Sequence, residues 1–213
     1  MRDSVARSST QDAILDATDI LLGKYGYKKM TIDDLAREVG IGKGTIYLHF
    51  VSKEEIALSH IDRIVERLKG RLETIISSPA TAAERLRRMM VERVTFRFDS
   101  VQHYTRSLNE LLSQLRAKLL ERRTRHFAEE AHLFVRVIEE GIKCGEFRKR
   151  PPASETARTL ILATNSLLPY NLSPAELGER AAIKARTEAI AEMLITGLNR
   201  RDDQRIDEGV KKK

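Results

Sequence analysis

Residues 31–53 read TIDDLAREVGIGKGTIYLHFVSK, and their spacing predicts two short helices joined by a sharp turn. Thr31 is a natural N-cap, and Asp34 three residues later completes a capping-box pattern that satisfies backbone N–H groups at the start of a helix. Gly40 stands where the chain turns, because glycine adopts a positive φ at little cost. The inward-pointing side chains should be Leu35, Val39, Ile41 and Ile46. This pattern is that of a helix-turn-helix.

The second of these helices is predicted over residues 43–50, with Ile46 and Phe50 buried one turn apart. Its remaining surface carries Lys43, Thr45, Tyr47, Leu48 and His49. Such side chains can contact phosphates and base edges in a major groove. Gly44 would let backbone N–H groups approach a phosphate closely. Tyr47 and His49 could instead be ordinary surface or core residues, but their neighbours favour DNA contact.

A third helix is predicted to begin after Ser52, with Glu55 at the capping-box position. Lys53 then falls in the first turn, where the helix dipole disfavours a cation. Residues 40–53 contain two lysines and no acidic residue. We therefore expect Lys53 to contact a DNA phosphate beside the second helix.

The chain resembles the tetracycline-repressor (TetR-type) family of bacterial transcription regulators. The resemblance rests on YGY at 25–27, MTIDDLA at 30–36, EVGIGKGTIYLHF at 38–50 and SKEE at 52–55. It implies a three-helix DNA-binding domain followed by a larger helical domain that binds effectors and dimerises. It also implies base contacts by Thr45, Tyr47 and His49, and phosphate contacts by Thr31 and Lys53. Lys43 would contact either.

Composition agrees with an all-α fold. The chain has 213 residues, of which 41% are hydrophobic and 5% aromatic, with no tryptophan. Alanine, leucine, glutamate and arginine, which favour helices, are abundant. We expect an N-terminal helix-turn-helix DNA-binding domain over residues 1–52. A helical effector-binding and dimerisation domain should follow over 53–198, with a disordered tail over 199–213.

The charge distribution gives only partial support for nucleic-acid binding. The formal net charge is +7, yet residues 1–60 hold eight lysines and arginines against nine aspartates and glutamates. The recognition helix therefore carries the DNA prediction without help from net charge. The single cysteine, Cys144, excludes an intramolecular disulfide. Because no apolar run approaches about 18 residues, we expect no membrane span and a cytoplasmic protein.

Caps and helix breakers predict the remaining helices. A first helix should start at Ser9 with Asp12 and end at Gly26, with an apolar face of Ala13, Ile14, Ala17, Ile20, Leu21 and Lys24. The helix from Ser52 should stop before Pro79, and Thr81 with Glu84 should cap the next one. A short helix is expected around Leu108, Leu111 and Leu112, and a longer helix should follow and end at about Lys143. The last two helices are expected over residues 154–168 and 175–198.

The last two helices carry apolar stripes that suit an interface. The residues expected there are Leu160, Ile161, Ile183, Ile190 and Leu194. Two such helices from each subunit would form the four-helix interface of a homodimer that the resemblance implies. Burial of the same residues within one subunit is the alternative.

An effector pocket is expected in the downstream domain, lined by the inward stripe of the helix at 81–98. Its candidate residues are Met89, Arg93, Phe96, His103, Tyr104 and Asn165. Methionine favours adaptable apolar sites, so we expect an apolar or amphipathic organic effector rather than a metal ion. No cofactor is predicted. His126 and Glu130 share a helix face, but a lone pair of this kind is more often a surface contact than a metal site.

The sequence lacks the motifs of the common enzyme classes. It contains no nucleophile elbow, no glycine-rich phosphate loop and no HExxH pair. We therefore do not expect an enzyme. The helix-turn-helix and the family resemblance together predict a regulator: a repressor that binds a near-palindromic double-stranded operator as a homodimer and is released by its effector. One alternative is an effector-independent DNA-binding protein that recruits a protein partner. Another is an enzyme whose catalytic residues converge only in the fold.

Overall fold

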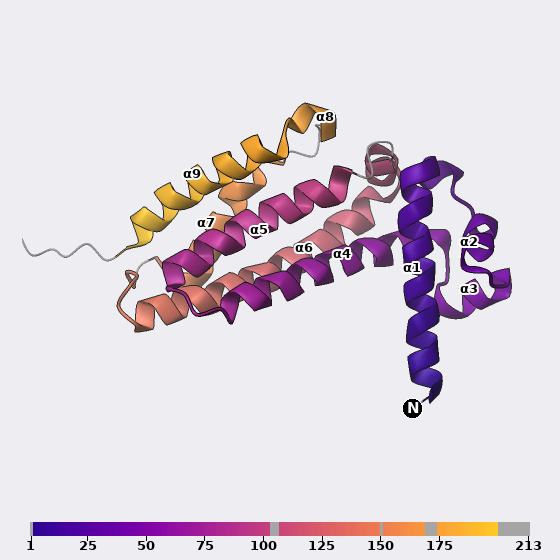
Figure 1. Cartoon of the computed structure of the whole chain (residues 1–213), viewed down its shortest axis with the longest axis horizontal. Coiled ribbons are helices and arrows are strands. Elements are labelled where there is room, and N and C mark those ends of the chain that lie inside the picture. The colour runs from indigo at the N-terminus through magenta and orange to yellow at the C-terminus, as the bar shows by residue number, and fades with distance from the viewer. Residues whose placement is uncertain (1, 103–106, 150, 169–173, 200–213) are drawn as a thin grey trace, which may run out of the picture.

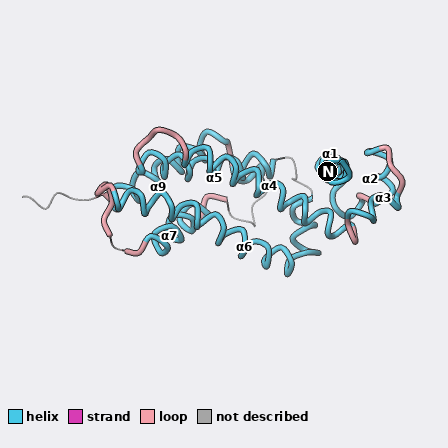
Figure 2. Tube along the Cα trace, turned by 90° about the horizontal axis from the view of Figure 1, so that it is seen from below, coloured by secondary structure: helices cyan, strands magenta, loops and turns pink. Residues whose placement is uncertain are grey.

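The computed structural model describes residues 2–102, 107–149, 151–168 and 174–199, and side chains within 9–100, 113–149, 151–168 and 176–199. The described helices are α1 (Arg2–Lys29), α2 (Ile32–Val39), α3 (Lys43–His49), α4 (Lys53–Ile76), α5 (Ala82–Gln102), α6 (Ser107–Lys143), α7 (Ala153–Asn165), α8 (Pro174–Leu177) and α9 (Arg180–Leu198). In these residues the only β pairing is an isolated bridge between Phe147 and Asn199. The predicted all-α fold is confirmed (Figures 1 and 2).

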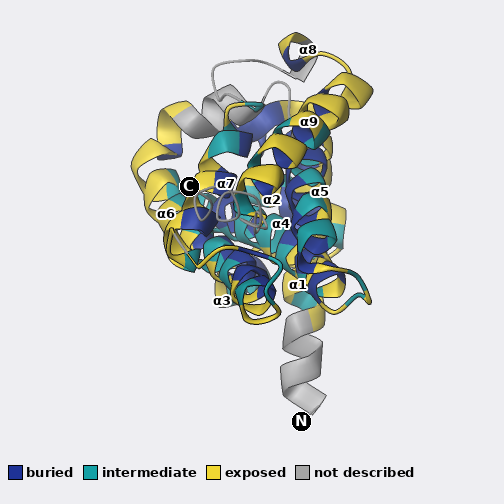
Figure 3. Ribbon diagram, turned by 90° about the vertical axis from the view of Figure 1, so that its left-hand side faces the viewer, coloured by how far each residue is buried: buried dark blue, intermediate teal, exposed yellow. Residues whose placement is uncertain are grey.

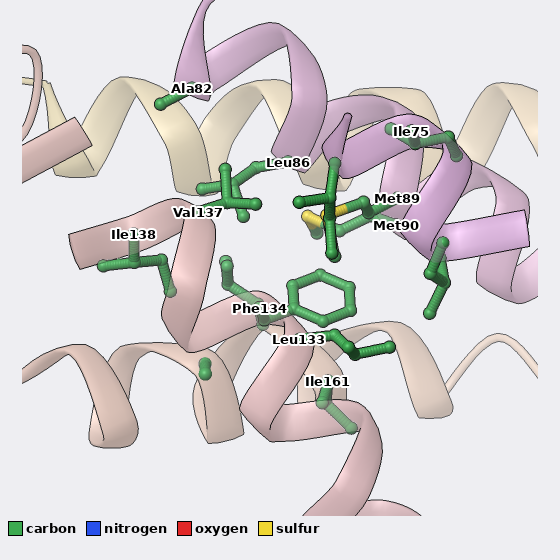
Figure 4. Packing of buried hydrophobic residues seen from close by; sticks show 14 of the residues in the cluster. Ile75, Ala82, Leu86, Met89, Met90, Leu133, Phe134, Val137, Ile138 and Ile161 are labelled. Carbon is green, nitrogen blue, oxygen red and sulfur yellow. The ribbon is translucent and has the colours of Figure 1, made fainter. Parts of the chain in front are cut away.

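Two large groups of buried side chains hold the described helices together, with a third, smaller group of Val94, Phe98, Leu177 and Ile183. The first, called the N-terminal core, joins α1, α2 and α3 to the start of α4 at one end of the molecule. The second, called the bundle core, lies between α4, α5, α6, α7 and α9. At its centre Met89 and Met90 of α5 face Phe134 and Val137 of α6 (Figure 4). Helix α6 reaches both cores, since Leu115 belongs to the first and Phe134 to the second.

The predicted caps form at three helix starts. Thr31 Oγ1 accepts a hydrogen bond from Asp34 N at 3.1 Å, and Thr31 N donates to the Asp34 carboxylate at 3.2 Å. Ser52 Oγ accepts from Glu55 N at 3.1 Å. Thr81 Oγ1 accepts from Glu84 N at 3.2 Å. These side chains satisfy backbone donors that the helix itself leaves unpaired.

The first helix differs from its predicted form. It begins at Arg2 rather than Ser9, and it passes through Gly26 with a kink (φ 79°, ψ 166°) before ending at Lys29. Its buried face consists of Ile14, Leu15, Ala17, Thr18, Leu21 and Leu22. Ile20 is 54% exposed, and Lys24 is also exposed, so both were wrongly assigned to this face. The apolar stripe lies about one residue away from the predicted one, because Leu15 and Leu22 extend it on the other side.

Two other helix boundaries were wrong. The predicted short and long helices before Lys143 are one continuous α6, since the sequence from Ser107 onward contains no glycine or proline until Gly141. The predicted last helix is instead divided into α8 and α9 at Gly178, whose φ is +84°. The side chains of Leu108, Leu111 and Leu112 and residues 200–213 of the predicted tail lie outside the described part of the chain.

A turn after α6 fastens the far end of the bundle. The Glu146 carboxylate accepts hydrogen bonds from the backbone N atoms of Ala82 and Ala83, each at 2.9 Å, and so caps the start of α5. Arg148 N donates to Leu198 O at 3.0 Å at the end of α9. Within the described residues, no helix is both long enough and apolar enough to cross a membrane.

Candidate nucleic-acid interface and effector region

The turn between α2 and α3 has the geometry that Gly40 was expected to supply. Gly40 lies in the left-handed region at φ 74° and ψ 32°. Its backbone N donates to Arg37 O at 3.3 Å, and Ile41 N donates to Ala36 O at 3.0 Å. This pair of bonds is the Schellman arrangement, which satisfies the last carbonyls of α2 and reverses the chain. It sets α3 at the edge of the molecule, where one side of the helix packs on the N-terminal core (Figure 1).

Helix α3 is anchored on one side and exposed on the other. Ile46 is completely buried and Phe50, which ends the helix, is 3% exposed. Tyr47 is 51% exposed, Lys43 and Gly44 are also exposed, and Thr45 and His49 are half-buried. The five residues of α3 that were predicted to contact DNA therefore lie on or beside one accessible surface.

Two of the predicted DNA-contacting side chains already have charged partners. The Lys43 ammonium lies 2.9 Å from the Asp33 carboxylate of α2, and this hydrogen bond raises the pKa of Lys43. The Thr31 hydroxyl donates to Asp34 at 2.6 Å, which lowers the pKa of that carboxyl. Both side chains remain exposed at the surface, so either can exchange its partner for a phosphate.

Lys53 has a structural role that the sequence did not indicate. Its ammonium donates to Tyr27 O at 2.9 Å and Met30 O at 3.1 Å, and it lies 4.4 Å from the centre of the Tyr27 ring. The charge thus stabilises the C-terminal end of α1, where a helix dipole favours a cation. The expected contact between Lys53 and a DNA phosphate stays a prediction.

The sequence placed Leu48 on the surface of α3 but assigned it no specific DNA contact, and its side chain is 71% exposed. Val51, directly after the helix, is 84% exposed. The signal for Leu48 was present in the sequence, because a residue two positions after the buried Ile46 points away from the core of a helix.

In the effector region, Arg93 joins three helices. It is 1% exposed and donates to Glu130 of α6 at 2.6 Å, to Thr164 of α7 at 3.3 Å and to Asn165 at 2.9 Å. Glu130 is completely buried and also accepts from Arg97. Burial alone would raise the pKa of Glu130, but the guanidinium groups of Arg97 and Arg93 outweigh burial and leave this pKa lowered.

Aromatic and amide groups complete this arginine cluster, which we define as Arg93, Arg97, Arg123, Phe127, Glu130 and Asn165. The three guanidinium groups lie 4.8–5.4 Å from the centre of the Phe127 ring. The amide nitrogen of Asn165 is buried and has no hydrogen-bond partner within the described residues. Sequence reasoning missed Glu130 and Phe127, because their spacing to Arg93 becomes apparent only when α5 and α6 are packed together.

The six predicted effector residues are only partly brought together. Arg93 and Asn165 are in direct contact. Met89 is buried in the bundle core, and Phe96 is half-buried with the Arg71 guanidinium 4.8 Å from its ring centre. His103 and Tyr104 lie outside the described residues.

The predicted interface residues mostly face the interior of their own subunit. Leu160, Ile161 and Ile183 are 1–2% exposed, and Ile190 and Leu194 are half-buried against the bundle core. The exposed apolar residues of α7 and α9 are instead Leu162, at 61%, and Met193, at 68%. The alternative of burial within one subunit therefore holds for the first three residues.

Comparisons with known proteins point to one family. The family described as "Bacterial regulatory proteins, tetR family" matches residues 14–59. The HTH-type transcriptional repressor KstR2 of Mycobacterium tuberculosis is 27% identical over 148 residues, which cover 66% of this chain and 70% of that protein. The fatty acid metabolism regulator protein of Bacillus subtilis is 24% identical over 189 residues, covering 87% of this chain and 94% of that one.

A solved structure extends the similarity in fold to most of the chain. The transcriptional regulator FadR from Bacillus subtilis, in complex with stearoyl-CoA, superposes with a TM-score of 0.64 and 19% identity, covering 88% of this chain and 98% of that chain. The family match spans α2, α3 and the turn between them, which include the Thr31 cap, the Gly40 turn and the buried Ile46. Residues 14–59 therefore match the tetR family of bacterial regulatory proteins.

Proposed function

We propose that this protein is a ligand-responsive transcriptional repressor that binds a near-palindromic operator through α3. The accessible face of α3, with Lys43, Tyr47 and Thr45 presented on a helix anchored by Ile46, carries the proposal. A helix of this size fits the major groove of B-DNA, and these side chains can bind phosphates or base edges. The relatives described as repressors support the sign of regulation.

Binding to an operator selected from random duplex DNA tests this proposal. Tyr47→Ala should weaken specific binding. Lys43→Ala should reduce the slope of log affinity against log salt by roughly 0.9 for each subunit bound, because one phosphate contact is lost. Lys184→Ala is the matched control, since both lysines have side chains that are 50% exposed and both are paired with a carboxylate. If the two lysine variants have the same slope as the parent, α3 does not face the phosphates as proposed.

The proposal includes a homodimer built from α7 and α9. Helix α9 is exposed along one side (Figure 3), where it presents Ala182, Ala185, Ala189 and Met193, and α7 exposes Leu162. Small side chains let helices approach closely, and Leu162 and Met193 supply apolar area to bury. Two copies would then present two α3 helices at half-sites about 34 Å apart or more.

The effector is proposed to be an amphipathic organic molecule that binds beside the arginine cluster. Arginine side chains and the Asn165 amide can bind an anionic or polar head group, and the apolar residues of α5 can contact its tail. The complex of FadR with stearoyl-CoA supports this class of ligand. Met89, Phe96, His103 and Tyr104 remain proposed contacts.

Helix α6 is proposed to transmit effector binding to α3. It carries Glu130 of the arginine cluster, and about two turns earlier Arg122 donates to both Glu55 carboxylate oxygens of α4 at 2.9 Å. His126 Nε2 lies 2.9 Å from Asp62 of α4. A displacement of α6 would therefore move α4 and the N-terminal core with it, and the effector shifts the equilibrium by its differential affinity for the two arrangements.

Thermal unfolding in the presence of stearoyl-CoA, free coenzyme A and divalent metal ions tests the effector proposal. Stearoyl-CoA at about 100 times its Kd should stabilise the protein by about 2.7 kcal/mol per site. Asn165→Ala should weaken that effect. Stabilisation by a divalent metal alone, abolished by a chelator, would overturn the organic effector.

A further inference from the structure

We infer that Leu48 determines part of the operator sequence by contacting the 5-methyl groups of thymine, an inference that rests on the proposed entry of α3 into the major groove. The residue is 71% exposed on a helix whose opposite side is fully buried. Its position and chemistry both restrict what it can recognise.

Leu48 lies at the outermost line of α3. Consecutive residues of an α-helix are about 100° apart, so Leu48 and Gly44 each lie about 160° around the axis from Ile46. Ile46 has no exposed surface and points directly into the N-terminal core. Tyr47 and Thr45 therefore flank this line on its two sides. Whatever faces α3 most closely meets Leu48 and Gly44 first.

Gly44 leaves room for DNA to approach the backbone of α3. A β-carbon on Gly44 would meet no atom within 4 Å, and the residue has no positive φ, so neither packing nor backbone conformation within this chain requires glycine there. Glycine also weakens a helix relative to alanine. The missing side chain leaves the backbone of α3 accessible at the same line as Leu48, which suits a partner that approaches the helix surface directly.

The chemistry of leucine selects the contact. Its side chain has no donor or acceptor, so it cannot read the hydrogen-bonding edges of guanine, cytosine or adenine. The thymine methyl group is the apolar group that bases display in the major groove. A contact with it buries apolar surface from both partners, which stabilises the complex.

The test compares thymine with deoxyuridine, which differs only by the methyl group, at each thymine of the selected operator. With the full-length parent, replacing one thymine in each half-site should weaken binding by about fourfold per methyl group. Leu48→Ala should weaken binding to the thymine operator and should bind the thymine and deoxyuridine operators equally. Val51→Ala, at an exposed residue outside α3, should keep the discrimination of the parent.

The outcomes separate this inference from the proposed function. If the parent binds an operator but no deoxyuridine replacement weakens binding, or if Leu48→Ala keeps the discrimination, Leu48 does not read thymine while operator binding stands. If the parent selects no operator at all, the proposed function fails first. Because the side chain is exposed, Leu48→Ala should melt at the same temperature as the parent, and this measurement excludes a folding defect.

Discussion

At the scale of single residues, Lys53 lies where the dipole of its own helix disfavours a cation, but its ammonium binds carbonyl groups at the end of α1. A cation in the first turn of α4 is disfavoured by that helix's dipole, whereas the end of α1 favours it. Lys53→Met keeps most of the aliphatic chain but removes the donors to Tyr27 O and Met30 O. We expect a loss of about 1–3 kcal/mol in the free energy of unfolding, measured by urea denaturation.

The control for this prediction is Lys43→Met. Its ammonium is paired with an exposed carboxylate, so its removal should leave the free energy of unfolding unchanged within the error of the measurement. Equal stability of the two methionine variants would show that the Lys53 contacts contribute little to the fold.

His60 should make the stability depend on pH. It is 2% exposed, and burial lowers its pKa to about 4, with Arg63 and Arg67 acting in the same direction and Asp19 opposing them. In the unfolded chain His60 has its ordinary pKa of about 6.5. The stability due to neutral His60 is therefore fully present above that pH and is lost as the pH falls toward 4. Between pH 6.5 and 4 this should lower the free energy of unfolding by about 3 kcal/mol. His60→Gln should make the free energy of unfolding depend less on pH in this range.

At the scale of helices, two glycines within helices should respond oppositely to alanine. At Gly141 of α6 a β-carbon would overlap the Phe147 ring and lie 2.9 Å from Ala82 Cβ, so Gly141→Ala should destabilise the protein by about 1–3 kcal/mol. At Gly70 of α4 a β-carbon would meet no atom within 4 Å. Gly70→Ala should therefore raise the free energy of unfolding by about 0.5–1 kcal/mol, because it lowers the entropy of the unfolded chain. Thermal unfolding of both variants checks the pair, and a stabilising Gly141→Ala would contradict the close packing there.

The sequence predicted helix starts well where the signal is local. Thr31, Ser52 and Thr81 cap helices through residues three positions later, so their spacing is visible in the chain. Lys53 and Glu146 could not be predicted in the same way. Their hydrogen-bond partners are 23 to 64 residues distant and become neighbours only after the helices have packed.

At the scale of the whole molecule, the sequence could not distinguish the two faces of α9. Ile183, Ala191 and Ile195 face the interior, while Ala182, Ala189 and Met193 face outward. Both sets are apolar or small and both recur at helical spacing, so periodicity alone fits either assignment. The packing of α5 against α9 decides which stripe is covered within the subunit.

This assignment changes which substitutions test the proposed dimer. A charge at Ile190 or Leu194 would disturb the bundle core as well as an interface, because both are half-buried there. Met193→Glu places the charge on a side chain that is 68% exposed in one subunit. Sedimentation velocity should show monomers for this variant, while its melting temperature at high dilution stays close to that of the parent. Because the two half-sites would no longer be linked, its affinity should fall on the palindrome and stay unchanged on an isolated half-site. A parent protein that is monomeric at micromolar concentration, or a dimeric Met193→Glu variant, would exclude this face as the interface.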